Sequence, residues 1–503
     1  MNFSAIRRVI GWILLFEAIF LLLPLLTAAV YWEEEFFVFL FCIALCASVG
    51  GLCLSKKLKN DAIYAKEGIV ITALCWIVLS LFGALPLYLS GADAYTSYVD
   101  ALFEIVSGFT TTGATIVPTG AEVAALPKSI LMWRSFSHWV GGMGVLVFMI
   151  AFLPLSGARN MYIMKAESPG PTVSKLVPKV RTTAKILYVI YAGMTAIQII
   201  LLLCGGMSFF ESVNAAFATA GTGGFSVKAD GFAGYSYYLQ IVVIVFMLLF
   251  SINFNSYYML GKRRWKEVLT AEVKAFLLIV FAAITAITLN VYYTNTITSF
   301  SGALKHSAFS VASVISTTGF ATEDFALWPM FSQILLLLIM FVGACAGSTG
   351  GGIKVSRLVV LGKSASNEIG KMLHPKQIKH VTVDGRVVEP DVVRSICAFV
   401  FLYVIVFIVS FLIISFDLNN LNYVGVENTK FMTGFSSVAA TLNNIGPGLG
   451  AVGPAGSFAA YSWWSKLVFI FDMLAGRLEI LPMLLLFAPS TWRREENRVH
   501  RDT

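Results

Sequence analysis

The sequence predicts an all-α polytopic membrane protein: four linked span–short-helix–span repeats around a pseudo-fourfold axis, preceded by two extra N-terminal spans. Three observations lead to this prediction. Of the 503 residues, 57% are hydrophobic and only 13% are charged, whereas a globular domain carries about 25% charge. Apolar segments of membrane-spanning length recur along the chain. Four shorter apolar stretches each end in a similar phrase that contains glycine.

Ten apolar segments are long enough to cross a bilayer, which takes about 20 helical residues. They lie at 9–31, 36–55, 68–90, 131–155, 186–204, 238–260, 275–293, 328–346, 395–416 and 464–488. Four further stretches of about 10–15 residues are too short to cross and too apolar for ordinary loops. They lie at 98–109, 209–219, 304–315 and 429–441. We expect each of them to be a re-entrant helix.

The basic residues indicate the orientation of the chain. Of the 36 Lys and Arg residues, 29 fall in six segments, at 7–8, 56–66, 159–185, 262–274, 354–394 and 493–501. Cytoplasmic loops carry such an excess, so we expect both termini in the cytoplasm. The alternation of sides is consistent only if every short stretch enters and leaves on the outer side. The net charge of +8 thus comes from loops that flank spans, and no nucleic-acid partner is needed to explain it.

Each short stretch leads into a polar phrase with glycine. The phrases are SGFTTTGATIV (107–117), FATAGTGGFSV (217–227), SVISTTGFAT (313–322) and AATLNNIGPGLG (439–450). We align them on Gly113, Gly223, Gly319 and Gly446. This repetition divides the chain into two extra spans (1–66) and four repeats, at 67–180, 181–270, 271–388 and 389–503. One alternative remains open, in which the phrases are turns chosen only for the backbone freedom of glycine.

The phrases have the composition of a cation filter. Irregular backbone at membrane depth is tolerated only where it is buried in protein or lines water. Four such phrases around one axis would form a pore lined by carbonyl oxygens, which can replace the hydration shell of a cation. The partially negative C-terminal ends of the short helices would favour a cation at the same place. The predicted ligands are Thr111, Thr112, Gly113, Thr222, Gly223, Thr317, Thr318, Gly319, Asn444, Ile445 and Gly446.

Acidic residues are absent from the phrases but gather on the predicted outer side. These are Asp93, Asp100, Glu104, Asp230, Glu323, Asp324, Asp417 and Glu427. They would concentrate cations at the pore entrance, or they would only form a solvated face. The sequence leaves both interpretations open.

The four joined span–pore–span units, with one glycine in each phrase, resemble the Trk/Ktr/HKT superfamily of potassium transporters. The two extra spans and the segment HWVGGMGVLVFMIAFLPLSGARNMYIMKAESPGP (138–171) are similar to its bacterial TrkH/TrkG branch. The resemblance implies that the four aligned glycines carry K⁺ selectivity. It also implies a bacterial inner-membrane location, a homodimer, and a cytosolic NAD- or ATP-binding regulatory subunit (TrkA-like). That subunit would dock on the basic segments 156–185 and 354–394.

The segment CAGSTGGGIKV (345–355) interrupts an apolar run with glycine. It is not a phosphate-binding P-loop, because Ile353 separates Gly352 from Lys354 and no hydroxyl residue follows that lysine. As one helix, residues 328–362 would reach ~50 Å at ~1.5 Å per residue, so the helix must bend or unwind below the third phrase. The resemblance implies an intramembrane gate at Gly347, Ser348, Thr349, Gly350, Gly351 and Gly352. A passive kink that relieves excess length is the alternative.

Arg477 lies within the last apolar segment. A charge at membrane depth costs at least ~2.5 kcal/mol on insertion scales, so this side chain should face the pore or a partner. The resemblance implies that it lines the cytosolic half of the pore beside the gate. An ion pair with Glu479 or Asp472 is the alternative.

The combined prediction is a potassium uptake protein, a channel-like membrane subunit that conducts K⁺, and also Rb⁺ or Na⁺, under the control of a cytosolic subunit. The alternative is a secondary-active cotransporter that moves K⁺ with H⁺ or Na⁺. Such proteins normally have inverted repeats, whereas the repeats here share one orientation. No nucleophile–base pair stands out, so we expect neither enzymatic activity nor an organic cofactor.

Overall fold

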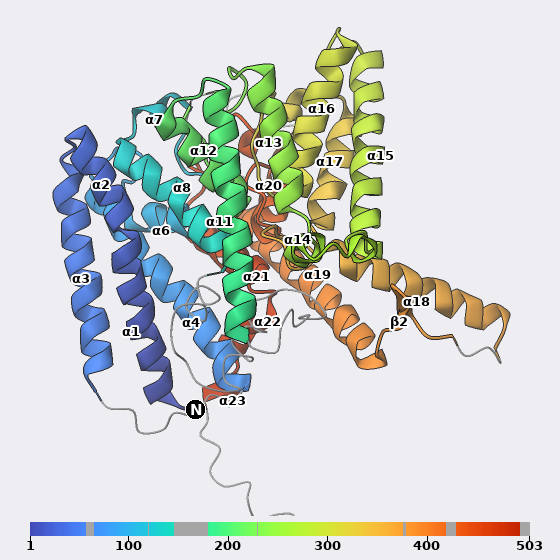
Figure 1. The fold of residues 1–503 in the computed structure, drawn as a ribbon, viewed down its shortest axis with the longest axis horizontal. Helices are drawn as coiled ribbons and strands as arrows, with labels where there is room; N and C mark the ends of the chain where they lie inside the picture. The colour runs from blue at the N-terminus through green and yellow to red at the C-terminus, as the bar shows by residue number, and fades with distance from the viewer. Residues whose placement is uncertain are drawn as a thin grey trace, which may run out of the picture.

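The protein is described by a computed structural model that covers residues 1–56, 65–118, 120–144, 180–228, 230–375, 379–418 and 429–492. It is mostly helical (Figure 1). The longer helices are α1 (Phe3–Phe20), α2 (Leu22–Tyr31), α3 (Glu35–Ser55), α4 (Ala65–Gly83), α6 (Tyr98–Phe109), α8 (Lys128–Gly142), α11 (Val180–Cys204), α12 (Phe209–Gly221), α13 (Tyr237–Phe250), α14 (Phe254–Gly261), α15 (Ala271–Tyr293), α16 (Phe300–Ile315), α17 (Met330–Val342), α18 (Val355–Leu373), α19 (Pro390–Leu418), α20 (Lys430–Leu442) and α21 (Trp463–Arg477). The short ones are α5 (Leu85–Leu89), α7 (Gly120–Ala125), η1 (Trp265–Glu267), η2 (Phe325–Leu327), η4 (Gly450–Val452), α22 (Leu481–Phe487) and α23 (Pro489–Trp492).

Within the described residues, six helical segments are long and apolar enough to cross a membrane. They are Phe3–Tyr31, Glu35–Ser55, Lys66–Leu89, Thr182–Cys204, Ala271–Tyr293 and Pro390–Leu418. A seventh candidate is the pair α13 and α14, which is bent by 93°. The prediction of a multi-pass membrane protein is confirmed.

The four short apolar stretches are helices, as predicted. They form α6, α12, α16 and α20, with 12, 13, 16 and 13 residues. A serine side chain accepts a hydrogen bond from a first-turn N–H in three of them, at Ser97, Ser208 and Ser299. These caps satisfy N–H groups that have no partner within a helix.

The helices that follow the glycine phrases are shorter than the sequence led us to expect. We predicted unbroken spans at 131–155, 238–260, 328–346 and 464–488. The structure instead contains α8, α13, α17 and α21, each with 13 to 15 residues; residues 145–155 lie outside the described residues. The prediction placed a break in the third repeat alone, whereas all four helices end at a comparable point.

Close packing explains two of these helix ends. A Cβ atom on Gly141, near the end of α8, would lie within 3.0 Å of the Phe109 carbonyl oxygen. A Cβ atom on Gly476, near the end of α21, would lie equally close to the Leu442 carbonyl oxygen. At both places a glycine therefore lets the helix end approach the backbone at the C-terminus of the preceding short helix.

The N-terminal helices form one side of the molecule (Figure 1), where α1 packs against α3 and α4. Gly11 and Gly50 lie at the contact of α1 with α3, since a Cβ atom on Gly50 would lie 2.9 Å from the Gly11 carbonyl oxygen. Small residues of this kind let membrane helices approach closely. Glu33, just after α2, accepts hydrogen bonds from the Lys128 and Ser129 N–H groups at 2.6 and 2.9 Å, and so joins this unit to the start of α8.

A long arm projects from the other side of the molecule. It consists of α18 and an antiparallel hairpin formed by β1 (Thr382–Val383) and β2 (Arg386–Val387) (Figure 1). These are the only strands in the part of the chain that the structure describes, and the sequence analysis did not predict them. The Asp384 carboxylate at the hairpin turn accepts a hydrogen bond from the Ala271 N–H at 2.8 Å. The hairpin therefore caps the start of α15.

Candidate functional site

The same backbone turn follows each of the four short helices. Its central residue has φ between 55° and 59°, a region that β-branched residues rarely occupy. These residues are Thr111, Thr222, Thr317 and Asn444. In each turn the next N–H group donates to a helix carbonyl five residues earlier, at 2.8 to 2.9 Å. Two residues after the central residue of each turn lies a glycine with φ between 79° and 97°. These glycines are Gly113, Gly224, Gly319 and Gly446.

These four glycines form a closed ring. A Cβ atom on any of them would lie within 3.0 Å of a backbone oxygen of the next turn, closer than real Cβ atoms approach. The pairs are Gly113 with Gly223 O, Gly224 with Thr318 O, Gly319 with Ile445 O, and Gly446 with Thr112 O. Each oxygen belongs to the residue before the next glycine. The four segments therefore meet around one centre, and their backbones approach too closely for any side chain.

The ring corrects the alignment of the second phrase. From the sequence we aligned Gly223 with Gly113, but Gly224 has the positive φ of 79° and the matching contact. Thr222 consequently corresponds to Thr111 rather than to Thr112, and Gly223 contributes the carbonyl that faces Gly113. The phrase GTGG contains two adjacent glycines, and sequence alone cannot tell which one takes the left-handed conformation.

The polar side chains of the turns are fully buried, and one of them joins two turns. The Asn444 side-chain amide donates to Thr112 Oγ1 at 2.9 Å, and this bond joins the last turn to the first. The Thr112 and Thr318 hydroxyls each contact a neighbouring hydroxyl of their own turn, at 2.8 and 2.7 Å. Ile445 is also buried, and its carbonyl belongs to the ring.

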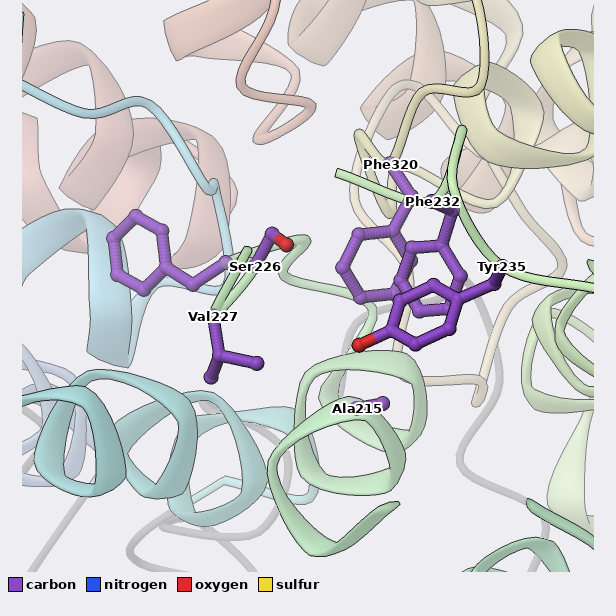
Figure 2. Close-up of a pocket in the computed structure, with 7 residues that line it drawn as sticks. Ala215, Ser226, Val227, Phe232, Tyr235 and Phe320 are labelled. Carbon is purple, nitrogen blue, oxygen red and sulfur yellow. The ribbon is translucent and has the colours of Figure 1, made fainter. Parts of the chain in front are cut away.

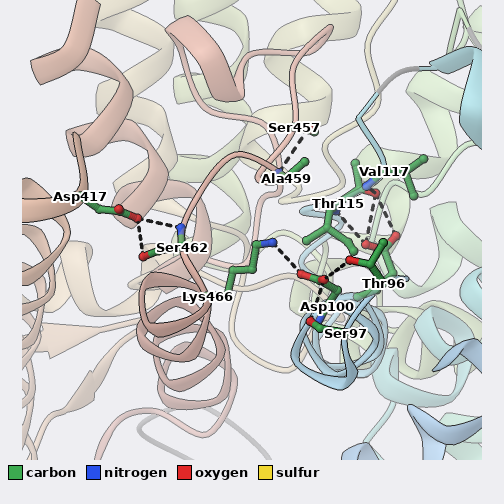
Figure 3. A network of polar contacts seen from close by, with 12 residues as sticks. Thr96, Ser97, Asp100, Thr115, Val117, Asp417, Ser457, Ala459, Ser462 and Lys466 are labelled. Carbon is green, nitrogen blue, oxygen red and sulfur yellow. Dashed lines mark hydrogen bonds and ion pairs between the residues drawn. The ribbon is translucent and has the colours of Figure 1, made fainter. Parts of the chain in front are cut away.

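Several predicted outer acidic residues are engaged in buried contacts. Asp100 forms an ion pair with Lys466 at 2.6 Å, and both side chains are 10% exposed. Asp417 accepts hydrogen bonds from the Ser462 N–H and hydroxyl groups (Figure 3). Glu104 is fully buried beside Arg134. For these three, the interpretation as a solvated face is wrong, whereas Asp93 and Glu323 are exposed.

A small pocket lies beside the second and third phrases. Ser226 and Val227 line it on one side, and Phe232, Tyr235 and Phe320 line it on the other, with Ala215 below them in the view (Figure 2). Phe225 also lines the pocket. The ammonium group of Lys228 lies 4.0 Å from the centre of the Tyr235 ring. The aromatic side chains that line this pocket pack beside the second and third phrases.

The glycine-rich loop packs against the turns and contacts Thr317, the central residue of the third turn. It runs from Gly343 to Lys354 between α17 and α18. The Gly351 N–H donates to Thr317 Oγ1 at 2.8 Å. A Cβ atom on Gly351 would also lie close to the Asn443 carbonyl oxygen of the fourth repeat. The predicted gate residues and the third and fourth phrases are therefore in direct contact.

Other contacts hold the two ends of this loop. The Cys345 N–H donates to the Ser251 carbonyl oxygen at the end of α13, at 3.0 Å. One oxygen of Glu272 on α15 accepts from the Ala346 N–H at 2.6 Å and from the Ser356 N–H at 3.1 Å. A single carboxylate thus joins the chain on both sides of the glycines.

Arg477 donates to backbone carbonyl oxygens that are distant in the sequence. It reaches the Gly141 and Gly142 carbonyl oxygens at the end of α8, at 2.5 and 2.7 Å. It also reaches the Thr349 carbonyl oxygen of the loop at 2.8 Å and Thr111 Oγ1 at 3.3 Å. The guanidinium group therefore lies between the first phrase and the loop.

Two charged residues in or just after the loop were not among the site residues predicted from the sequence. Arg357 on α18 forms an ion pair with Glu479, two residues after the end of α21, at 2.5 Å. The buried Lys354 donates to the Gly350 carbonyl oxygen within the loop. Lys354 and Arg357 lie shortly after Gly352. A basic residue directly after a predicted helix break is the sequence feature that could have indicated them.

Comparison with known proteins identifies the family. A family model, TrkH, described as a cation transport protein, matches residues 35–494. The chain belongs to this TrkH family. Among family members it is 35% identical to a protein of Vibrio parahaemolyticus named Trk system potassium uptake protein TrkH, over 98% of this chain and all of that protein. It is 34% identical to the Trk system potassium uptake protein TrkG of Escherichia coli K12, again over 98% of this chain and all of that protein.

A solved TrkH structure has the same fold. The crystal structure of the potassium transporter TrkH from Vibrio parahaemolyticus matches with a TM-score of 0.84 and 32% identity. The match covers 98% of this chain and all of that one. The resemblance inferred from the sequence is confirmed at the level of the family.

Proposed function

We propose that this chain is the membrane-spanning, channel-like subunit of a potassium uptake system. The observation that carries the proposal is the closed ring of four backbone turns, each at the C-terminal end of a short helix. Relatives over the whole length of the chain are named potassium uptake proteins. The ring of backbone turns and the names of the relatives both support a path for K⁺ across the membrane.

In this proposal the four repeats surround a pseudo-fourfold pore, and backbone carbonyls take the place of the water around K⁺. The filter consists of Thr111 to Gly113, Thr222 to Gly224, Thr317 to Gly319 and Asn444 to Gly446. Desolvation of the ion is compensated because carbonyl oxygens approach it from all four quarters. The C-terminal ends of α6, α12, α16 and α20 add a partial negative charge at the centre.

The loop from Gly347 to Gly352, together with Arg477, would act as the gate. A positive charge below the filter repels a cation, and the loop fills the space beneath two phrases. Movement of the loop and of the Arg477 side chain out of the ion path would open the pore. The hydrogen bonds from Arg477 to the Thr349 carbonyl oxygen and from the Gly351 N–H to Thr317 Oγ1 support this role.

The wider assembly in the proposal follows the TrkH family resemblance. The chain would lie in a bacterial inner membrane with both termini in the cytoplasm, form homodimers, and bind a cytosolic nucleotide-binding subunit. The repeat boundaries at 67, 181, 271 and 389 belong to the same proposal. The projecting arm of α18 and its hairpin support a docking surface on the basic segment 354–394.

Flux measurements on purified protein in liposomes test the proposed function. We expect ⁸⁶Rb⁺ uptake that is inhibited by K⁺, needs no H⁺ or Na⁺ gradient, and gives channel-like current steps. Liposomes with the Gly113→Ala variant should lose discrimination between K⁺ and Na⁺. Equal K⁺/Na⁺ ratios for the two proteins would overturn the filter.

A coupled K⁺/H⁺ or K⁺/Na⁺ transporter is the second candidate, and two buried carboxyl groups favour it. Glu17 and Asp472 are fully buried. Both Glu17 oxygens and Asp472 Oδ2 have no hydrogen-bond partner among the described residues. Uptake that ceases when an imposed proton or sodium gradient is removed would favour this candidate over the channel.

A further inference from the structure

The four short helices differ at the position nine residues before the ring glycine. This position is occupied by Glu104, Ala215, Ser310 and Ser437. Glu104 alone carries a charge, and it is fully buried. A buried carboxylate is costly unless it is paired and hydrogen-bonded, so its presence in one quarter of the ring requires a specific partner.

That partner is Arg134 on α8. Its Nη2 and Nε atoms lie 2.7 and 2.9 Å from Glu104 Oε1, and the two side chains are 2% and 0% exposed. The Asp100–Lys466 pair lies one helical turn earlier on α6. Of these two ion pairs, the Glu104–Arg134 pair is the one whose hydrogen bonds, within the described residues, reach the chain that leaves the ring glycine.

The pair holds the segment that follows Gly113. Glu104 Oε2 accepts a hydrogen bond from the Ile116 N–H at 2.9 Å, and Glu104 Oε1 accepts one from the Thr115 hydroxyl at 2.9 Å. Arg134 Nη2 reaches the same hydroxyl at 3.3 Å. The backbone two and three residues beyond Gly113 is therefore fixed by charged groups behind it.

The same arginine also reaches the second phrase. Its guanidinium carbon lies 4.2 Å from the ring centre of Phe225, the residue directly after Gly224. One turn along α8, His138 Nε2 accepts from the Phe225 N–H at 3.3 Å, and His138 Nδ1 lies 2.8 Å from the Gly108 carbonyl oxygen. Side chains of α8 thus join the first and second turns of the ring.

We infer that Glu104 and Arg134 are positioning residues for ion selectivity: they set the spacing between the first and second quarters of the filter. The inference rests on the proposed function, since it assigns selectivity to the ring. The side chains stand behind the backbone and do not reach the ion. They act by fixing Thr115, Ile116 and Phe225, so that the Gly113 and Gly223 carbonyls keep their positions.

The test is the K⁺/Na⁺ permeability ratio of the full chain in liposomes, with the K⁺ flux and the melting temperature measured on the same samples. Glu104→Gln keeps the size of the side chain and removes its charge. We expect the ratio to fall about tenfold, the effect of losing one charge-assisted hydrogen bond, while K⁺ flux persists. Glu104→Asp, which restores the charge, should recover part of the ratio at a similar melting temperature.

Two matched variants control for burial and for charge. Ser310→Ala changes the equivalent position of the third helix, where the hydroxyl has no hydrogen-bond partner among the described residues. Asp100→Asn breaks the neighbouring buried ion pair. We expect both to retain the unmodified ratio. A similar fall in either variant would overturn the inference, because the effect would then be general.

The outcomes separate this inference from the proposed function. If Gly113→Ala lowers the ratio and Glu104→Gln does not, the filter stands and the positioning role is wrong. If Gly113→Ala leaves the ratio unchanged, the filter itself is wrong. Should Glu104→Gln fail to accumulate in membranes, the double variant Glu104→Gln with Arg134→Gln, which leaves no unpaired charge, takes its place with the same expected fall. An unchanged ratio in that protein counts against the pair.

Discussion

At the residue scale, four turns adopt the same uncommon conformation with different side chains. Thr111, Thr222 and Thr317 are β-branched, yet each has positive φ. Such a conformation costs of order 1–3 kcal/mol and persists only where the surroundings determine it. Here a hydrogen bond from the next N–H to the helix fixes each turn, and the crowded ring leaves no room for another arrangement.

The first prediction concerns Gly224, which the sequence analysis passed over. Gly224→Ala should lower the K⁺/Na⁺ ratio about tenfold or more, because displacement of one ring carbonyl that costs ~1.4 kcal/mol changes a ratio by that factor. The added Cβ would collide with the Thr318 carbonyl oxygen. Reversal potentials in bi-ionic solutions measure the ratio.

Gly193→Ala is the control for this substitution, since a Cβ atom on Gly193 of α11 has no atom within 4 Å. It should behave as the unmodified chain. A Gly224→Ala protein that folds and keeps full selectivity would show that the second turn does not belong to the filter.

The second prediction concerns the charge of Arg477. Arg477→Ala should raise K⁺ flux several-fold in the absence of any partner subunit. A positive charge at the level of the Thr111 hydroxyl repels cations, and its hydrogen bond also holds the Thr349 carbonyl oxygen. Arg394→Ala, which removes an exposed charge paired with Asp391 on α19, should leave the flux unchanged. Equal or lower flux in folded Arg477→Ala would exclude the charge as a barrier.

At the element scale, helix ends determine the site more than helix faces do. The short helices α6, α12, α16 and α20 lead into the ring, and α8, α13, α17 and α21 end beside it. The glycine-rich loop follows the end of α17 and contacts the end of α13, through the Cys345 N–H and the Ser251 carbonyl oxygen. It also contacts the third turn, through the Gly351 N–H and Thr317 Oγ1.

The third prediction tests how this loop is held. Glu272→Ala should increase basal K⁺ flux without a change in the K⁺/Na⁺ ratio, because the carboxylate joins the Ala346 and Ser356 N–H groups on both sides of the glycines. Flux and ratio are measured on the same liposomes. Glu267→Ala, five residues earlier, breaks an exposed pair with Arg264 and serves as the control. Unchanged flux in Glu272→Ala would mean that the loop is held by its other contacts.

The sequence predicts some of these elements and not others, for physical reasons. The short helices could be predicted because an apolar stretch of their length is too short to span the bilayer and too hydrophobic to stay in water. The early ends of α13 and α21 were not predicted, because the mean hydropathy of a membrane-length window stays high when it contains one polar residue such as Ser251 or Arg477. Such a window therefore indicates a single unbroken span. The choice of Gly224 over Gly223 depends on the position of the neighbouring turn, which no local pattern contains. Glu104 and Arg134 lie on separate helices, so no local sequence pattern pairs them. Their contact and their burial are seen only in the structure.

At the scale of the whole molecule, the ring closes between distant parts of the chain. Asn444 bonds to Thr112 across 332 residues. The Phe458 N–H also donates to the Thr115 carbonyl oxygen at 2.8 Å. The first turn of the ring is therefore held in part by residues from the C-terminal part of the chain.

The last prediction concerns the orientation of the whole chain, which follows from the excess of basic residues on one side. Asn295 is exposed in the turn after α15, and Ala365 is exposed on the projecting α18. In intact cells a membrane-impermeant maleimide should label Asn295→Cys and should label Ala365→Cys only after the membrane is opened, each measured above the labelling of the unmodified chain. The reverse pattern would place the loop on the outer side of the ring, and the proposed gate would then face the wrong solution.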